Sequence, residues 1–169
     1  MRYFLVGFMG SGKTHWARQW SAAFGLKWYD LDEEIEKREK QTISQLFQTL
    51  GEEGFRKKEH EALCTLLHLD DFIMSCGGGT PCFYDNMQRM NRAGVTIYLQ
   101  ASPAELAQRL KLEKEARPLI RDVADEVLES FIAAKLNERH ACYAQAMYHF
   151  QTRLLKNENF EKIHRRYAK

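Results

Sequence analysis

The stretch Gly7–Thr14, with the sequence GFMGSGKT, constrains the fold of this chain more than any other. It matches the pattern G-x-x-x-x-G-K-[ST], in which glycines let the backbone wrap its N–H groups around an anion. Such a loop needs a strand before it and a helix after it. The apolar run Tyr3–Val6 and the helix-forming run Lys13–Ala23 supply both. We therefore predict a loop that binds the phosphates of a nucleoside triphosphate, helped by the N-terminus of the following helix.

This loop supplies the first candidate site residues. The nucleotide-binding set is Gly10, Ser11, Gly12, Lys13 and Thr14. Lys13 would place a positive charge on the β- and γ-phosphates, so it is also a candidate catalytic residue. The hydroxyl of Thr14 is a candidate ligand of Mg²⁺, which is the one cofactor that we expect.

Strand-like and helical segments alternate along the chain. The strand candidates are Tyr3–Val6, Trp28–Tyr29, Phe72–Ser75, Val95–Leu99 and Phe150–Leu154. The charged stretches between them carry apolar residues at helical spacing. This alternation predicts an α/β fold with a parallel sheet, whose ligands bind at the carboxyl ends of the strands. Those ends carry Gly7–Thr14, Asp30–Asp32 and Gly77–Gly79.

Length and charge limit the classes of function. The chain has 169 residues, and we predict one domain over residues 1–169. Its 25 basic and 23 acidic residues leave a formal charge of +2, too small an excess for a nucleic-acid binder. No apolar run predicts a membrane span or a signal peptide. We expect a cytoplasmic monomer whose partners are small molecules.

The four cysteines lack metal-binding spacing, so we expect buried free thiols. Cys76 and Cys82 flank the glycines Gly77–Gly79, a position that could make either thiol reactive. Our expectation for both is nevertheless a packing role.

A pair of acids, Asp30 and Asp32, follows the second strand candidate. In extended chain their carboxylates would point to the same side. One could reach Mg²⁺, directly or through water, and the other could accept a hydrogen bond from an alcohol. The alternative is a helix cap, because Asp32 begins a run that starts like a helix. Since the third strand candidate ends without an acid, this pair is the expected source of a carboxylate near the metal.

Further motifs accompany these two. In chain order the set is Gly7–Thr14, Asp30-x-Asp32, Gly54-Phe55-Arg56-x-x-Glu59, Gly77-Gly78-Gly79, Arg117-Pro118-Leu119 and Arg139-x-x-x-Tyr143. In these motifs, their order and their spacing, the chain resembles shikimate kinase over essentially its whole length. The phosphate loop alone is common to many kinases, whereas the whole set is highly specific.

The resemblance implies a fold like that of the nucleoside monophosphate kinases, with a five-stranded parallel sheet in the order 2-3-1-4-5 flanked by helices. It also implies a substrate-binding segment at about residues 31–60 and a lid at about residues 110–125. The implied activity is that of a transferase that passes phosphate from ATP to the 3-hydroxyl of shikimate. The product, 3-phosphoshikimate, leads to chorismate and the aromatic amino acids.

The family's acceptor residues carry over to Asp32, Arg56, Gly77–Gly79 and Arg139. The two arginines would hold the carboxylate of shikimate, since guanidinium and carboxylate pair through two parallel hydrogen bonds. Asp32 would accept hydrogen bonds from the ring hydroxyls and could take the proton of the attacking one. The bare backbone of the glycines would approach the ring. Without the resemblance, both arginines would be read as solvated residues on helices.

On the nucleotide side, the resemblance makes Arg117 a catalytic and nucleotide-binding residue that descends with the lid onto the transferring phosphate. An arginine there stabilises charge on the γ-phosphoryl oxygens. Arg109 matches a nucleotide-binding position near the adenine, and Asp30 matches the acid near Mg²⁺. The family's proline near the adenine is missing from residues 156–160, which puts that adenine contact in doubt.

Two other functions remain open at this point. One is another small-molecule kinase of the phosphate-loop class, acting on gluconate or on a nucleotide. The other is a nucleotide-binding module without catalysis, which would be expected to have lost Lys13, Asp32 or Arg117. All three residues are present.

Overall fold

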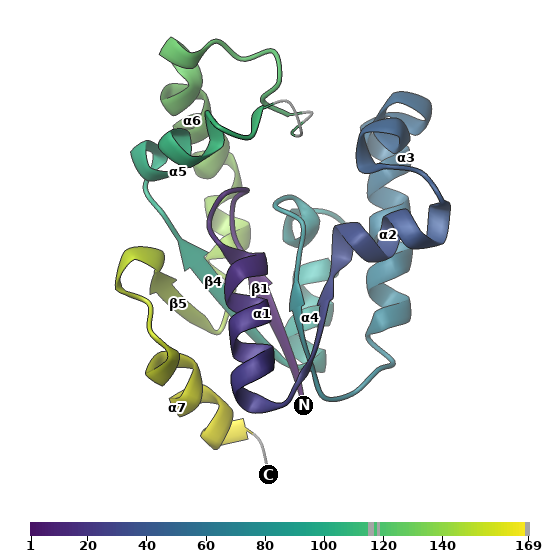
Figure 1. Ribbon diagram of the computed structural model, residues 1–169. Coiled ribbons are helices and arrows are strands. Elements are labelled where there is room, and N and C mark those ends of the chain that lie inside the picture. The colour runs from purple at the N-terminus through teal and green to yellow at the C-terminus, as the bar shows by residue number, and fades with distance from the viewer. Residues whose placement is uncertain (115–116, 118, 168–169) are drawn as a thin grey trace.

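The computed structural model describes residues 1–114, 117 and 119–167. Its centre is a five-stranded parallel sheet in the order β2-β3-β1-β4-β5, which confirms the predicted topology. The strands are β1 (Arg2–Val6), β2 (Lys27–Asp30), β3 (Phe72–Ser75), β4 (Val95–Gln100) and β5 (Tyr148–Gln151). Because all pairs are parallel, the carboxyl ends of the strands lie at one edge of the sheet (Figure 1).

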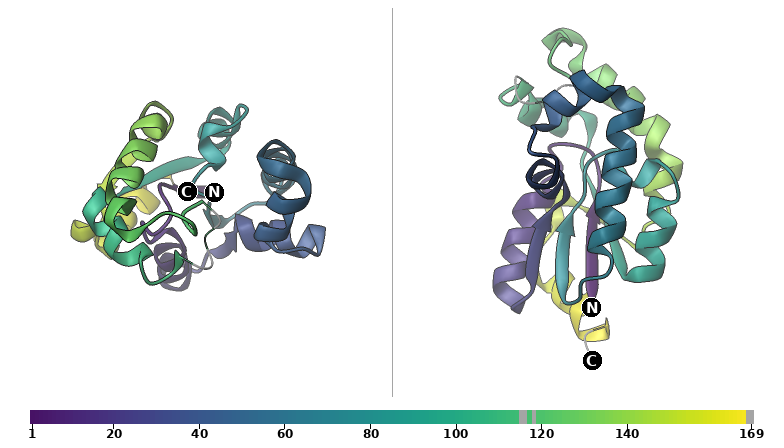
Figure 2. Two further views of the ribbon diagram at one scale, coloured as in Figure 1. Left: turned by 90° about the horizontal axis from the view of Figure 1, so that it is seen from above. Right: turned by 90° about the vertical axis from the view of Figure 1, so that its right-hand side faces the viewer.

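Helices cover both faces of this sheet (Figure 2). They are α1 (Lys13–Phe24), α2 (Leu31–Glu39), α3 (Ile43–Leu66), α4 (Asn86–Ala93), α5 (Pro103–Leu110), α6 (Asp125–Tyr143) and α7 (Asn157–Tyr167). Two short 3₁₀ turns, η1 (Thr80–Cys82) and η3 (Thr152–Leu154), complete the described elements. No helix among the described residues is long and apolar enough to cross a membrane.

Alternate residues of the central strands enter two separate cores. On one face Tyr3 and Leu5 pack against α1 and α7, where the rings of Trp20 and Phe160 stack at 4.5 Å between centroids. On the other face Phe4 and the other buried strand residues of that face pack against α2, α3, α4 and α6. Both faces of the sheet are therefore buried, which is why the strands read as continuous apolar runs. This burial holds the carboxyl edge of the sheet rigidly in place.

A third cluster lies beyond that edge. Phe8 of the phosphate loop packs with Leu106 and Leu110 of α5 and with Leu128 and Ile132 of α6. In Figure 1 the α5–α6 pair and the α2–α3 pair rise on opposite sides of the phosphate loop. The loop therefore lies between two helical pairs that belong to different parts of the chain.

The prediction for the fifth strand was wrong in its boundaries. We expected Phe150–Leu154, whereas β5 is Tyr148–Gln151 and residues Thr152–Leu154 form η3. Tyr148 and Phe150 point to the same side with parallel rings, and β5 pairs with β4 only as far as Gln100, where β4 ends. Without a neighbouring strand beyond that point, the chain turns instead of extending.

A glycine breaks the long helix α3. Gly51 has φ 67° and ψ −178°, so the helix is interrupted there. The left-handed φ suits glycine because a side chain would be strained in it. Thr42 caps the first part through a capping box with Gln45. The second part carries Arg56 back toward the sheet, where Phe55 and Leu63 join the core.

The predicted lid at residues 110–125 lies only partly within the described structure. Residues 115, 116 and 118 fall outside the described residues, and with them Pro118 of the R-P-L motif. Residues 168 and 169 at the end of the predicted domain also fall outside them.

Candidate active site

The phosphate loop connects β1 to α1, and within it the N–H of Ser11 donates to the carbonyl of Phe8 at 3.2 Å. Gly10 and Gly12 have φ 77° and 85°, a left-handed conformation that favours glycine. Gly12 is the N-cap of α1 and supplies no side-chain cap. No side chain therefore accepts hydrogen bonds from the first N–H groups of α1, which is the arrangement found at anion-binding helix termini. The buried hydroxyl of Ser11 likewise has no partner among the described residues.

Lys13 folds back over this loop. Its Nζ donates hydrogen bonds to the carbonyls of Gly7 and Phe8, both at 2.9 Å. Burial lowers the pKa of Lys13 to about 8, although the nearby carboxylate of Asp32 opposes that shift. The amine is thus held over the loop, where a bound phosphate would supply counter-charge and raise its pKa again.

Thr14, Asp30 and Ser75 form an oxygen cluster beside Lys13. The Thr14 hydroxyl donates to Asp30 Oδ2 at 2.7 Å and lies 3.0 Å from Ser75 Oγ. Hydroxyl and carboxylate oxygens are the donors that Mg²⁺ accepts, and it commonly takes only one or two from protein. No group of three or more His, Cys, Asp or Glu that could hold a metal occurs in the part of the chain that the structure describes. The cluster therefore fits a Mg²⁺ that completes its shell with phosphates and water.

The acid pair is arranged differently from our expectation. The chain is not extended through it, because α2 already begins at Leu31. Asp30, rather than Asp32, is the N-cap, and its Oδ1 accepts from the N–H of Asp32 at 3.1 Å. A capping carboxylate accepts a hydrogen bond from the N–H two residues later in the chain. The bond from the Asp32 N–H therefore identifies Asp30 as the cap. Both acids nevertheless line the same cavity.

Asp32 has an unusual ionisation. Its pKa is raised to about 7, chiefly by burial and then by the neighbouring carboxylates of Glu59 and Asp30, while Lys13 and Arg117 partly offset this rise. A carboxyl group with a pKa near the working pH can serve as a proton acceptor. Its position in the first turn of α2 keeps it beside the glycines at the end of β3, since a Cβ on Gly77 would lie 3.1 Å from Asp32 Oδ1.

Arg56 is buried on α3 and held by acids on its own helix. Its Nη1 donates to Glu59 Oε2 at 2.9 Å, and Glu59 Oε1 accepts from the Thr80 hydroxyl at 2.5 Å. The guanidinium lies 4.3 Å from the ring centroid of Phe83. Its Nε is buried and has no hydrogen-bond partner among the described residues. One donor of this fork is therefore left for another group.

Arg139 approaches from the opposite side, on α6. Its guanidinium lies 5.4 Å from the ring centroid of Phe8, and its buried Nη1 also lacks a partner within the described chain. One turn later, Tyr143 donates a hydrogen bond to the carbonyl of Gly78 at 2.5 Å. This bond ties α6 to the glycines that follow β3.

The glycine triplet, Gly77–Gly79, separates the two arginines. A Cβ on Gly79 would lie 2.6 Å from Arg56 Cζ, and one on Gly78 would lie 3.4 Å from Arg139 Nη1. A Cβ on Gly77 would lie 2.8 Å from Glu59 Oε1. The missing side chains thus make room for protein groups as well as for any ligand. A side chain on Gly79 would displace the Arg56 guanidinium, and one on Gly77 would displace the Glu59 carboxylate.

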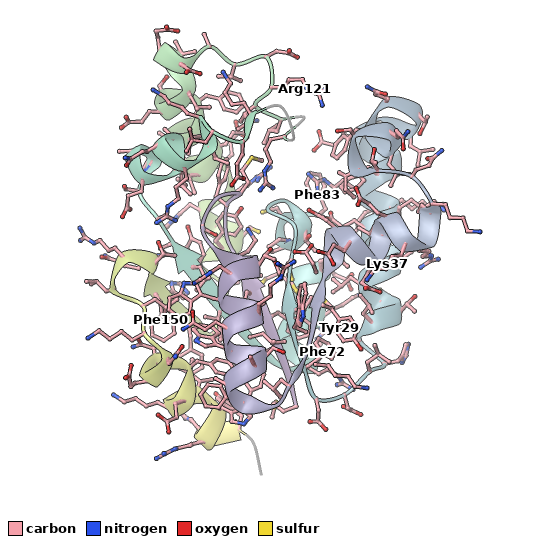
Figure 3. The ribbon with its side chains drawn as sticks, viewed as in Figure 1. Tyr29, Lys37, Phe72, Phe83, Arg121 and Phe150 are labelled. Carbon is pink, nitrogen blue, oxygen red and sulfur yellow. The ribbon has the colours of Figure 1, made fainter. Side chains whose placement is uncertain are left out.

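Many of the predicted residues line one cavity of about 420 Å³. Those that line it are Gly10, Gly12, Lys13, Thr14, Asp30, Asp32, Gly77, Gly78, Arg109 and Arg117. Arg109 Nη1 donates to the carbonyl of Gly10 at 2.9 Å, and Arg117 pairs with Glu113 at 2.9 Å. Ser11, Arg56, Gly79 and Arg139 do not line it. Arg56 lines another cavity together with Phe83. Figure 3 shows Phe83 between the two helical pairs.

The shikimate kinase family model matches residues 9–168 of this chain. The chain belongs to the shikimate kinase family. It is 41% identical over 157 residues to a shikimate kinase of Phocaeicola vulgatus, covering 93% of this chain and 90% of that protein. It is 42% identical over 158 residues to one of Parabacteroides distasonis, covering 94% and 91%. Membership of this family makes the chain an ATP-dependent kinase.

Solved structures agree with this family. A shikimate kinase from Bacteroides thetaiotaomicron superposes with a TM-score of 0.87 at 38% identity, covering 98% of this chain and 95% of that one. One from Acinetobacter baumannii, in complex with shikimate, gives 0.89 at 29% identity, covering 99% and 95%. A deoxyadenosine kinase from M. mycoides with bound dATP gives 0.59 at 14% identity, which shows only a shared fold.

Three residues of this shikimate kinase family member contribute more to the site than their sequence context indicates. Glu59, the last residue of the motif that contains Arg56, is fully buried and also binds Thr80. Its spacing of three residues from Arg56 was the available signal. Ser75 occupies the strand end where we noted the missing acid, and it contacts Thr14. No local pattern indicated Thr80, whose role depends on the turn η1.

Proposed function

We propose that the chain transfers the γ-phosphoryl group of ATP to the 3-hydroxyl of shikimate, giving 3-phosphoshikimate and ADP. The family match supports this reaction. The observation that carries the choice of acceptor is the pair of buried, unpartnered nitrogens, Arg56 Nε and Arg139 Nη1, on either side of the glycine triplet. Buried donors without partners are costly, so they point to an absent acceptor. A carboxylate is the planar anion that two such guanidinium groups suit.

On the nucleotide side, the N–H groups of residues 10–14 would bind the β- and γ-phosphates. Lys13 would leave the carbonyls of Gly7 and Phe8 for the phosphate oxygens. Thr14, with Asp30 through water, would hold Mg²⁺, which would offset the charge of the phosphates. Arg109 lies at the cavity rim, where the nucleoside would extend.

On the acceptor side, Asp32 would accept a hydrogen bond from the attacking hydroxyl. With a pKa of about 7, its carboxyl group is about half ionised at neutral pH, so both protonation states are accessible. A loose phosphoryl-transfer transition state asks for little proton abstraction before bond formation. The main role of Asp32 would therefore be to orient the hydroxyl, with the proton moving to Oδ as the bond to phosphorus forms.

The segment at residues 110–125 would act as a lid and carry Arg117 onto the γ-phosphoryl group. Here Arg117 pairs with Glu113 at the surface, an exchangeable partner. Closure would exclude water, which competes with the alcohol for the phosphoryl group. All proposed groups come from one chain, so we propose a monomer, acting as one domain in the cytoplasm, where ATP is available.

An acceptor panel tests the proposal. Purified protein, ATP and Mg²⁺ are combined in turn with shikimate, gluconate, a nucleoside monophosphate or no acceptor, and ADP release is measured. We expect release with shikimate alone. Release with gluconate or the nucleotide but not with shikimate would assign the chain to another acceptor class. No release with any acceptor would favour a non-catalytic module.

A further inference from the structure

A histidine outside the proposed chemistry lies beside the acceptor residues. His60 follows Glu59 on α3 and is half-buried. Its Nδ1 lies 2.6 Å from Oδ1 of Asn86, the fully buried first residue of α4, and its ring centroid lies 4.8 Å from that of Tyr84. Two consecutive residues of α3 therefore contact residues 80–86, the segment that follows the glycine triplet.

The hydrogen bonds of Asn86 determine where His60 carries a proton. Asn86 Nδ2 donates to the carbonyl of Thr80 at 2.9 Å. The other polar atom of this amide, Oδ1, can only accept, so His60 Nδ1 is the donor of the bond between them. In the neutral imidazole the second ring nitrogen, Nε2, is then an acceptor, and it lies 3.6 Å from the thiol of Cys64, a weak donor. Each side-chain atom in this group thus has a consistent role.

Thr80 connects the bond of His60 to the acceptor residues. The Thr80 hydroxyl donates to Glu59 Oε1 at 2.5 Å, and Glu59 Oε2 accepts from Arg56 Nη1 at 2.9 Å. Thr80, Glu59 and Asn86 are all fully buried, so none of them can exchange a lost partner for bulk water without a cost. A continuous row of hydrogen bonds therefore runs from His60 to the guanidinium of Arg56.

The segment at residues 80–86 depends on contacts with α3 for its conformation. Tyr84 has φ 52°, in the left-handed region that side chains rarely adopt, and it is 58% exposed. A residue in such a conformation keeps it only where its surroundings fix it. Directly before the segment, Gly79 packs against Arg56, because a Cβ there would lie 2.6 Å from Arg56 Cζ. A shift of residues 80–86 would therefore reach the guanidinium.

We propose that His60 is a positioning residue for Arg56 and acts through this row of hydrogen bonds. The inference rests on the proposed function, in which Arg56 holds the carboxylate of shikimate. Without the Nδ1 donor, Asn86 Oδ1 is a buried acceptor that has lost its partner. Residues 80–86 then shift to satisfy it, and the hold of Thr80 on the row is loosened. The loss falls on binding of shikimate, because the nucleotide-binding loop is not part of the row.

Two substitutions of His60 separate the hydrogen bond from the ring. His60→Phe keeps a ring against Tyr84 but removes the donor to Asn86. His60→Asn removes the ring, yet its amide nitrogen follows Cγ as Nδ1 does, so it can donate to the same oxygen. Steady-state release of ADP gives kcat and the two KM values for each variant. His68→Ala, which replaces an exposed histidine just beyond α3, is the control.

We expect the KM for shikimate to rise on the order of tenfold in His60→Phe, as for one buried group left without its partner. The KM for ATP and kcat should stay at their wild-type values. In His60→Asn and in the control, the KM for shikimate should stay near that of wild type. An unchanged KM in His60→Phe, or an equal rise in His60→Phe and His60→Asn, would overturn the proposal.

The tautomer of His60 tests the geometry without any substrate. A long-range ¹H–¹⁵N spectrum at pH 8, assigned by the peaks that vanish in His60→Phe, should show the proton on Nδ1. A proton on Nε2 would overturn the row of hydrogen bonds. If the proton lies on Nδ1 but wild type does not use shikimate, the proposed function fails, and the effect on the substrate with it. If wild type phosphorylates shikimate and His60→Phe has the same KM, the role of His60 fails alone.

Discussion

The two halves of the site are built in different ways. The nucleotide half, residues Gly7–Thr14, is one continuous segment whose lysine bonds to carbonyls of its own loop. The acceptor half, formed by Asp32, Arg56, Gly77–Gly79 and Arg139, comes from α2, α3, the end of β3 and α6. The first half is positioned by local backbone geometry, whereas the second exists only when four distant elements are packed. The acceptor half should therefore respond more strongly to changes outside the site.

The halves also differ in how their charges are held. In the nucleotide half, the buried amine has two carbonyl acceptors and several acids nearby. In the acceptor half, Arg56 depends on the fully buried Glu59, which depends in turn on Thr80. Breaking a buried pair leaves an uncompensated charge. Five predictions, in decreasing order of effect, test this contrast.

Replacing Lys13 by alanine should give the largest effect. The variant loses the cation that stabilises charge on the transferring phosphoryl group, so kcat should fall at least about 1,000-fold. Steady-state release of ADP measures this. Because the nucleotide half is built locally, the Kd of Lys13→Ala for shikimate should change less than about threefold, which is near the precision of a titration. A matched loss of shikimate affinity would show that the two halves are not independent.

Replacing Arg139 by alanine should act on the acceptor half alone. Losing one charge-assisted contact costs on the order of 2–4 kcal/mol, so the Kd for shikimate should rise by roughly 100-fold. Arg139→Lys keeps the charge but loses the planar fork, and it should recover only part of the affinity. Lys135→Ala, on the same helix but paired with Glu138 at the surface, is the control. Unchanged shikimate affinity in Arg139→Ala would contradict its assignment.

Glu59→Gln tests the dependence of the acceptor half on a residue that does not line the cavity. The Glu59 side chain is 1% exposed, against 60% for Glu52, the second acid that pairs with Arg56. We expect Glu59→Gln to lower the free energy of unfolding by on the order of 3 kcal/mol and to raise the shikimate Kd about tenfold. Glu52→Gln should change both little, since exposed pairs contribute about 0–1 kcal/mol. Similar effects in the two variants would refute the distinction.

The pH dependence of kcat/KM should depend on one titrating group from each half of the site. Asp32, with a pKa of about 7, is the acceptor-side group that must be ionised, and Lys13, with a pKa of about 8, is the nucleotide-side group that must be protonated. The value of kcat/KM should therefore peak between these values and fall about fivefold by pH 6 and by pH 9. A flat profile from pH 6 to pH 9 would contradict both assignments.

The raised pKa of Asp32 also predicts how the stability of the protein depends on pH. The folded state keeps a proton on Asp32 up to about pH 7, while the unfolded chain loses it near 3.8. The folded state thus binds more protons in this window, and its free energy of unfolding falls as pH rises through it. Asp32→Asn removes that cost, so it should be more stable than wild type at pH 8 by on the order of 1–2 kcal/mol, while losing activity. Lower stability than wild type at pH 8 would count against the raised pKa.

The contrast between the halves also explains what the sequence could predict. The nucleotide half follows from eight consecutive residues and their flanking strand and helix. The sheet order and the acceptor residues required the resemblance to a family, because no local pattern relates Arg56 to Arg139. The acid pair shows the limit of local reasoning: an extended segment was expected, yet Asp30 caps a helix that begins one residue later.

Other features depended on tertiary packing that no local rule describes. The fifth strand shifted because its limits are set by pairing with β4 rather than by its own apolar residues. Glu59 became a buried link to Thr80 only through the fold of η1 against α3.

A structure with shikimate and a non-hydrolysable ATP analogue bound together tests the central claim most directly. We predict that the shikimate carboxylate lies within hydrogen-bond distance of Arg56 Nε and of Arg139 Nη1. We also predict that the 3-hydroxyl faces Asp32 on one side and the γ-phosphorus on the other. A carboxylate bound elsewhere, with both arginine nitrogens still unpartnered, would contradict the account.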